Sequence, residues 1–451
     1  MALTVDEIAL IERHQAAMAQ NVIADDLADA YYNHEHLLNN LGLMPDDLYR
    51  SYQSVVGWGG TAVDTWEPRS DIQSLSLPDS AQADDRLRQI WETNNLASEL
   101  SPLLVDRYTY GRWYLSIGAG DKRGDLPIIR PECPKTMGII VDERTRRTLS
   151  ACKVYGRDDL NNHPLYATLY LPDETIWAEK RDGQWEEADR NRHKLGRVPV
   201  VMSPFGRRSG GLGWRSAINA TLRGASDSAT RAVTNMNIAS DAHGLPYRWA
   251  TGVAKADFVD ATGAQKPAWM LRADAIWATG KADAKFGNFE SASLSNFETQ
   301  MDVLIGQAAA AAKLPQRYFG KQTANPPSAD AIRAEEYELV KFVERQNTQV
   351  GAAIGWALAV ALKVMDPSSE WVDGSRIGVQ WIDPATPTVA QREDALMKRR
   401  SQGIISREGY WDELGWDEPR KDKERENLER EANDPTMARA LDAILGTPDA
   451  A

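Results

Sequence analysis

Residues 325–336 read NPPSADAIRAEE, and they begin the longest helical pattern in the sequence. A proline-bounded loop precedes Ser328, whose hydroxyl suits the N-cap position of a helix. Beyond Ser328, apolar side chains recur at three- and four-residue spacing as far as about Val364. We therefore predict one long helix over residues 328–366.

Two glycines, Gly351 and Gly355, lie inside this helical pattern, and we expect the helix to bend at one of them. Residues 367–387 then contain a short apolar run that predicts a single strand. Residues 388–451 read as helices, and their segment 417–434 holds eight acidic and five basic residues. That mixture of charges is typical of a solvated helix or a frayed end.

Upstream of the quoted stretch, two more helical patterns flank a short insertion. Stripes of apolar and small side chains at helical spacing cover residues 214–241 and 292–312. At 1.5 Å per residue, the first would be a rod of roughly 40 Å. The insertion, residues 242–291, shows short strand and turn patterns, and residues 313–327 form a basic loop that contains Pro315.

Residues 1–213 form an N-terminal body in which helices precede strands. Residues 5–38 have a helical pattern, and from Tyr114 the apolar period changes to two. Short alternating runs follow, separated by Gly, Pro and Asp-Gly turns, and Asp182-Gly183 is the clearest hairpin signal. This order of elements predicts an α+β fold.

The composition is that of an ordinary globular protein. Its 451 residues are 42% hydrophobic and 26% charged, which excludes disorder over most of the length and favours about three domains. Two cysteines, Cys133 and Cys152, are too few for a disulfide framework, so we expect a reducing compartment. The first residues lack the pattern of a signal peptide, and we expect neither secretion nor membrane insertion.

The net charge of −13 argues against a protein that binds nucleic acid by neutralising phosphates. The acidity is uneven, however. Residues 1–50 hold nine acidic and two basic residues, whereas residues 189–231 hold nine basic and two acidic ones. Such separation of charge is typical of an ordered assembly. Chance variation in charge among solvated helix faces would explain it equally well.

A search for catalytic, cofactor and metal motifs finds none. His34 and His36, two positions apart on a helix, would point away from each other and could not share an ion. Ser150 and Lys153 match a hydrolase motif, but they lie in an alternating strand and its supporting motifs are missing. The glycine-rich residues 206–213 do not have the phosphate-loop spacing, and we interpret them as a hinge.

Three strings, together with the order of elements, resemble the portal proteins of tailed bacteriophages, the head-to-tail connectors. They are LPQRYFG at 314–320, the quoted stretch at 325–336, and VQWIDP at 379–384. The middle string is similar to the Asn-Pro-x-Ser-Ala-x-Ala-Ile-Arg-x-x-Glu signature of the family's tunnel helix. The resemblance covers roughly residues 27–414, and Pro327 departs from it because the family more often has a small residue there.

The resemblance implies a phage portal fold with a β-rich wing, long stem helices, a small α/β clip, a kinked tunnel helix and a helical crown. The implied parts are the wing (1–213 with strand 367–387), stem (214–241 and 292–312), clip (242–291), tunnel loop (313–327), tunnel helix (328–366), and crown with tail (388–451).

The resemblance also implies a non-enzymatic function without cofactors. We expect a ring, with twelve copies, at a unique capsid vertex, through which double-stranded DNA is packaged and ejected. The expected partners are the major capsid and scaffolding proteins, the terminase large subunit and later a head-tail adaptor. The protein would be assembled in the host cytoplasm and remain in the virion.

Two sets of basic residues are the candidate site residues. In the tunnel loop, three residues would touch DNA phosphates weakly without reading bases: Lys313, Arg317 and Lys321. The alternative is that these three are solvated or paired with neighbouring carboxylates. Around the first stem helix, three arginines would face acidic surfaces of the next subunit: Arg215, Arg223 and Arg231.

Three other functions remain open at this stage. One is another ring-forming virion or head-tail adaptor protein that does not dock terminase. A second is a nucleic-acid-processing enzyme such as a nuclease, which would need carboxylates clustered at metal spacing. A third is a cytoplasmic hydrolase whose triad is scattered along the sequence.

Overall fold

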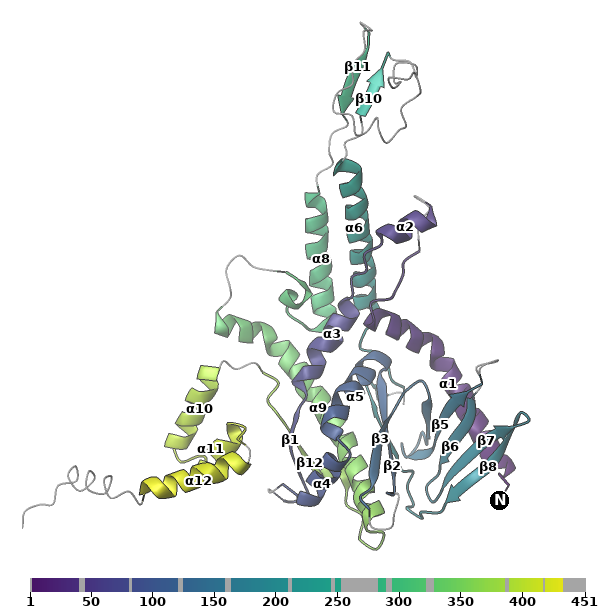
Figure 1. Ribbon diagram of the computed structural model, residues 1–451, viewed down its shortest axis with the longest axis vertical. Helices are drawn as coiled ribbons and strands as arrows, with labels where there is room; N and C mark the ends of the chain where they lie inside the picture. The colour runs from purple at the N-terminus through teal and green to yellow at the C-terminus, as the bar shows by residue number, and fades with distance from the viewer. Residues whose placement is uncertain are drawn as a thin grey trace, which may run out of the picture. The chain divides into compact units, whose positions relative to one another are not determined.

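The computed structural model divides the chain into two compact units, Met1–Pro384 and Ala385–Ala451 (Figure 1). Helices and antiparallel sheets occupy separate stretches of the first unit, which confirms the predicted α+β class. The structure describes residues 2–39, 45–80, 83–120, 125–158, 164–209, 213–244, 248–252, 283–288, 294–321, 328–385, 389–416 and 418–432.

Helix α9 (Ala329–Met365) runs through the first unit and confirms the predicted long helix. Its N-cap is Ser328, whose hydroxyl accepts a hydrogen bond from the Ala331 amide at 3.2 Å. Every side chain in residues 357–361 is buried. By length and composition α9 could cross a membrane, but 61% of its most apolar window is buried inside the chain. It is therefore the core helix of this unit.

A buried arginine joins helix α5 (Leu96–Tyr110) to α9. The Arg107 side chain is 0% exposed, and its guanidinium donates to Gln346 Oε1 and Gln349 Oε1, both at 2.9 Å. The same group reaches strand β9 (Val200–Pro204), donating to Ser203 Oγ at 3.1 Å and to the Pro204 carbonyl at 3.2 Å. Burial lowers the pKa of Arg107 to about 10. One cation thus fixes three elements through neutral acceptors.

The two glycines of α9 lie where other elements approach the helix, and a bend at either of them stays a prediction. Helix α9 is continuous across both, and a Cβ at Gly355 would lie 2.3 Å from the carbonyl oxygen of Gly374. A Cβ at Gly351 would lie 3.2 Å from Trp381 Nε1. Glycine is therefore needed at position 355, where η4 (Gly374–Arg376) approaches the helix backbone, while Gly351 gives room to β12 (Gly378–Trp381).

Strand β12 confirms the single strand predicted in 367–387, and its partner is β1 (Ile72–Ser76). A three-stranded sheet has the order β3-β2-β9, and a five-stranded antiparallel meander has the order β4-β5-β6-β7-β8. Their other strands are β2 (Arg112–Gly118), β3 (Ile128–Glu132), β4 (Met137–Val141), β5 (Thr148–Arg157), β6 (Pro164–Tyr170), β7 (Thr175–Arg181) and β8 (Gln184–Asn191). Asp182 and Gly183, with φ of 47° and 81°, form the predicted hairpin turn between β7 and β8.

Helix α1 (Val5–Tyr32) packs on the meander through Ile11 and Met18. It also contacts β2 through a buried ion pair in which Arg112 donates to both oxygens of Asp25, at 2.9 and 2.7 Å. The remaining N-terminal helices are α2 (Asp46–Tyr52), α3 (Trp58–Trp66), η1 (Glu67–Arg69) and α4 (Asp85–Thr93).

The predicted clip and crown are described only in part. In 242–291, strands β10 (Arg248–Thr251) and β11 (Lys285–Asn288) pair antiparallel, and residues 245–247, 253–282 and 289–291 lie outside the described ranges. The second unit contains helices α10 (Val389–Ser401), α11 (Arg407–Glu413) and α12 (Glu418–Ala432), which agrees with the helical prediction. The tail beyond residue 432 also lies outside the description.

The close approach at Gly355 gives a first prediction. Gly355→Ala should lower the free energy of unfolding by roughly 1–3 kcal/mol, because its methyl group would overlap the Gly374 carbonyl. The matched control is Gly224→Ala in a helical position with nothing within 4 Å, which should be neutral or stabilising by up to about 1 kcal/mol. Thermal unfolding followed by circular dichroism measures both, and equal stability of the two variants would contradict the packing argument.

Candidate functional site

Helices α6 (Ala220–Gly244) and α8 (Ser295–Ala312) lie side by side in an antiparallel pair and are the candidate stem (Figure 1). Small side chains are buried along both, including Ala229 on α6 and Ala308 on α8. Small residues permit close approach of the two helix backbones. At the base of the pair, the Asn219 side chain donates to the Ala311 carbonyl at 3.3 Å.

Helix α6 begins at Ala220 rather than at the predicted Trp214, because the preceding residues bond to other elements. The Arg215 amide donates to the Phe205 carbonyl at 3.2 Å, and the Ala217 amide donates to the Tyr108 carbonyl at 2.8 Å. The Asn219 side chain then accepts from the Leu222 amide at 3.0 Å and caps the helix. The predicted start is thus wrong because these long-range backbone bonds override the apolar stripe.

An extended segment, residues 53–56, is held against α6 by buried threonines. The Val56 amide donates to Thr230 Oγ1 at 3.0 Å, and the Ser54 amide donates to Thr234 Oγ1 at 3.3 Å. Both threonines are fully buried. The sequence analysis did not predict this attachment. The sequence does hold one sign of it, because two threonines four residues apart lie on the face of the helix that carries the apolar stripe, where a buried hydroxyl needs a hydrogen-bond partner.

Just beyond the C-terminal end of α8, near the base of the pair, lies a group that we name the Glu336 cluster, formed by Arg69, Arg317, Tyr318, Glu335 and Glu336. Arg317, in the short helix η3 (Gln316–Phe319), donates to Glu335 at 2.7 Å and also to Glu336. Tyr318 donates to Glu336 at 2.8 Å, and Arg69 reaches Tyr318 at 2.8 Å and Glu336 at 3.4 Å. Glu336 is a buried residue of α9 and accepts hydrogen bonds from the tunnel loop and from Arg69 of η1. The cluster therefore joins these three segments.

The structure places the three tunnel-loop candidates in different surroundings. Arg317 belongs to the Glu336 cluster, and the Lys321 ammonium lies 3.3 Å from Asp302 of α8. The Lys313 ammonium lies 5.4 Å from the centre of the Phe342 ring, at the C-cap of α8. Within one chain, Arg317 and Lys321 are therefore paired with neighbouring carboxylates, as the alternative to DNA contact predicted. Contact of the three with DNA stays a prediction.

The three interface arginines are not brought together. Arg215 is exposed and lies against Gly206, and the Arg223 guanidinium lies 5.9 Å from the centre of the Tyr31 ring. In Arg231, one buried guanidinium nitrogen has no hydrogen-bond partner within the part of the chain that is described. Their role in subunit contact stays a prediction.

A cluster that sequence reasoning missed joins the end of α1 to α6. Tyr31 donates to Asp227 at 2.7 Å and stacks on the imidazole of His36, with ring centres 4.2 Å apart. Burial raises the pKa of Tyr31 and lowers that of His36. The helical argument about His34 and His36 was wrong, because α1 ends at Tyr32 and both histidines lie beyond it.

The structure separates the residues of the apparent hydrolase motif. The hydroxyl of Ser150 lies 2.9 Å from His14 Nε2, whereas the Lys153 ammonium lies 2.6 Å from Glu132. Ser150 and Lys153 therefore do not act on each other. Across the described ranges, no group of three or more His, Cys, Asp or Glu side chains is placed to hold a metal ion.

A family model described as phage portal protein, SPP1 Gp6-like, matches residues 12–436 of this chain. The portal protein of Mycobacterium phage L5 is 34% identical over 418 residues, which cover 90% of this chain and 85% of that protein. The portal protein of Mycobacterium phage D29 is 34% identical over 397 residues, which cover 86% of this chain and 81% of that protein.

Two solved chains also align with most of this one. A chain from the neck of an empty GTA particle has a TM-score of 0.46 and 15% identity, covering 83% of this chain and 94% of its own. A chain from the virion of a native gene transfer agent particle has a TM-score of 0.42 and 14% identity, covering 88% and 99%.

The Glu336 cluster gives a second prediction. Glu336→Ala removes the acceptor shared by Arg69, Arg317 and Tyr318, and should cost roughly 1–3 kcal/mol of local stability. Glu335→Ala, at an exposed position with one arginine contact, should cost less than about 1 kcal/mol. Hydrogen exchange of residues 316–321 measures the difference. Similar protection of these amides from exchange in both variants would show that Glu336 does not hold residues 316–321 in place.

Proposed function

This chain belongs to the SPP1 Gp6-like family of phage portal proteins, and on that basis we propose that it forms a ring at a unique capsid vertex. The ring contains twelve copies, and double-stranded DNA passes through it during packaging and ejection. The clip, residues 242–291, docks the terminase large subunit and later a head-tail adaptor. The major capsid and scaffolding proteins surround a ring that is assembled in the host cytoplasm.

The observation that carries this proposal is the antiparallel pair of α6 and α8, attached at its base to a large α+β body. Away from that base, α8 is mostly exposed in a single copy, and Val303 is 58% exposed. An exposed apolar side chain on such a helix fits packing against the same helices of neighbouring copies. Helices joined around an axis in this way would enclose a passage.

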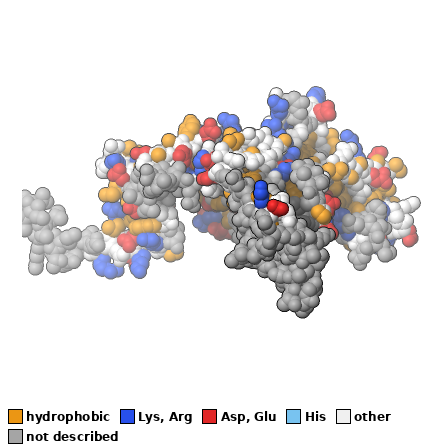
Figure 2. Space-filling model, turned by 90° about the horizontal axis from the view of Figure 1, so that it is seen from above, with side chains coloured by type: hydrophobic (Ala, Val, Ile, Leu, Met, Phe, Trp, Pro, Cys, Tyr) orange, Lys and Arg blue, Asp and Glu red, His pale blue; other side chains and the backbone are white. Residues whose placement is uncertain are grey.

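The charge of the chain supports a passage that encloses DNA without holding it tightly. Each phosphate neutralised by a Lys or Arg adds affinity through counterion release, so many such contacts would oppose sliding. On the face shown in Figure 2, basic and acidic side chains are interspersed among the described residues. The exposed pair of Lys321 with Asp302 is weak, and its lysine can exchange the carboxylate for a passing phosphate.

A packaging experiment tests the proposal. In a phage that carries this gene, the double variant Lys313→Glu and Lys321→Glu should package shortened genomes or lose DNA after packaging, with several-fold fewer full-length particles. Arg317 is left unchanged because its reversal would also break the Glu336 cluster. The control is Lys341→Glu, at an exposed position on α9 outside the tunnel loop.

Ring formation by the double variant is checked first by negative-stain microscopy, so that an assembly defect is not mistaken for a channel defect. Normal rings with unchanged genome length and retention would refute a role of these two lysines in DNA passage.

A further inference from the structure

A basic pocket of about 640 Å³ lies between β4, β9, the residues after β9 and the middle of α9. Four arginines line it: Arg146, Arg197, Arg207 and Arg208. No Asp or Glu is among its lining residues as the structure describes them, and the four arginines form no ion pair with another described residue, although Asp373 lies close enough to act on Arg197. The net charge of the chain is −13, so four arginines in one pocket create a local positive potential that would attract an anionic partner.

The pocket is built to present donors. The guanidinium carbon of Arg197 lies 3.5 Å from the centre of the Trp356 ring, and a guanidinium stacked in this way keeps its N–H edge for an anion. Gln349 lines the pocket and accepts from Arg107 through its oxygen, so its amide nitrogen remains as a donor. The buried charge of Arg107 adds to the positive potential behind the pocket.

On the side of α5 that faces α1 and α3, the charge has the opposite sign. We name Asp29, Asp64, Glu67 and Asp106 the acidic patch. The Tyr32 hydroxyl donates to Asp64 at 3.2 Å, and the pKa of Tyr32 rises to about 12 through burial and this carboxylate. Glu67 and Asp106 also lie close enough to act on Tyr32.

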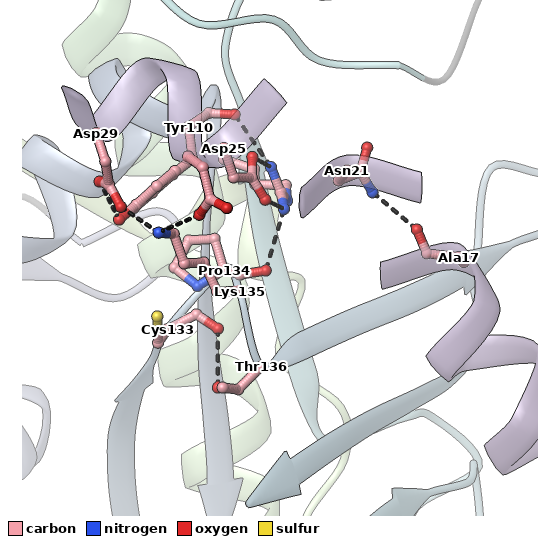
Figure 3. A network of polar contacts seen from close by, with 11 residues as sticks. Ala17, Asn21, Asp25, Asp29, Tyr110, Cys133, Pro134, Lys135 and Thr136 are labelled. Carbon is pink, nitrogen blue, oxygen red and sulfur yellow. Dashed lines mark hydrogen bonds and ion pairs between the residues drawn. The ribbon is translucent and has the colours of Figure 1, made fainter. Parts of the chain in front are cut away.

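Figure 3 shows Lys135, one cation of this region. A second, Arg112, pairs with Asp25 and lies close enough to act on Asp106. Lys135 pairs with Asp26 at 2.9 Å and with Asp29, and Asp29 also accepts from Tyr110 at 2.5 Å. Burial and the nearby Asp29 raise the pKa of Asp106 to about 7. Asp64, Glu67 and Asp106 form no ion pair with any other residue in the described ranges, so the negative charge of the patch is only partly balanced.

Helix α5 separates the pocket from the acidic patch. Arg107 points to β9 and α9, where its acceptors Ser203, Pro204 and Gln349 line the pocket. Asp106, the preceding residue, lies near Asp29 of α1 instead. One copy therefore cannot bring its own patch to its own pocket. A ring contact between identical copies is heterologous and needs two different, complementary surfaces, and these are two such surfaces.

We infer that the basic pocket receives the acidic patch of the adjacent copy, with Asp64 and Glu67 meeting Arg207 and Arg208. This inference rests on the proposed ring. Arginine binds carboxylates through paired N–H groups, so the contact would fix the orientation of neighbouring copies as well as attract them. Three of the four pocket arginines belong to residues 189–231, whereas Asp29 is the one member of the acidic patch within residues 1–50.

A charge exchange tests the inference. Variant A carries Arg207→Glu and Arg208→Glu, and variant B carries Asp64→Arg and Glu67→Arg. Each alone should lower the yield of rings at least about tenfold, because every interface would join like charges. Mixed in equal amounts, A and B should form rings of alternating copies, since one interface is then of the original kind and the next is fully reversed.

Native mass spectrometry measures ring yield and composition, and circular dichroism establishes that each variant is folded. The control variant, Arg88→Glu with Lys341→Glu, changes the charge by the same amount as A at exposed positions outside both surfaces and should form rings normally. Normal rings from A alone, or folded A and B that remain unassembled when mixed, would overturn the inference.

Two further outcomes separate this inference from others. If A forms normal rings but loses affinity for a 30-base-pair duplex, the pocket takes phosphates, and the inference is wrong while the ring stands. If the unaltered chain forms no ring under any assembly condition, the proposed function fails, and the inference fails with it.

Discussion

A charged guanidinium that is removed from water must be satisfied by hydrogen bonds, and the first unit is organised around one such group. Arg107 holds α5, β9 and α9 at fixed separations through four neutral acceptors. After β9 the chain returns to α5, where the Ala217 amide bonds to the Tyr108 carbonyl just before α6 begins. The position of the stem helices therefore depends on the same junction that carries the long core helix.

The sequence predicted the elements whose signals are local. Ser328 marks the start of α9, and Asp182-Gly183 marks a hairpin, because a cap and a two-residue turn depend on neighbouring residues alone. It did not predict β1, whose partner β12 lies about 300 residues away, or the true start of α6. Nor could it predict the close approach at Gly355. These features are set by contacts between distant segments, which no local pattern contains.

The candidate site shows the same limit. The sequence identifies the basic residues of the tunnel loop but not their partners. In the structure Arg317 pairs with Glu335 and Glu336 of the same chain, inside the Glu336 cluster. Charge separation along the chain was equally compatible with chance and with assembly. The structure shows a pocket with four arginines and a patch with excess carboxylates on different sides of α5, and only some of these residues belong to the two segments of opposite charge. The family membership then supplies a reason for such surfaces, since a ring needs two of them.

The central claim is that the α5–β9–α9 junction holds α6 and α8 so that copies of this chain enclose a passage. Single-particle cryo-electron microscopy of the purified full chain tests it most directly. The account predicts a closed ring with α6 and α8 of every copy around a central opening. A compact monomer, or a ring in which these two helices lie at the outer rim, would contradict it.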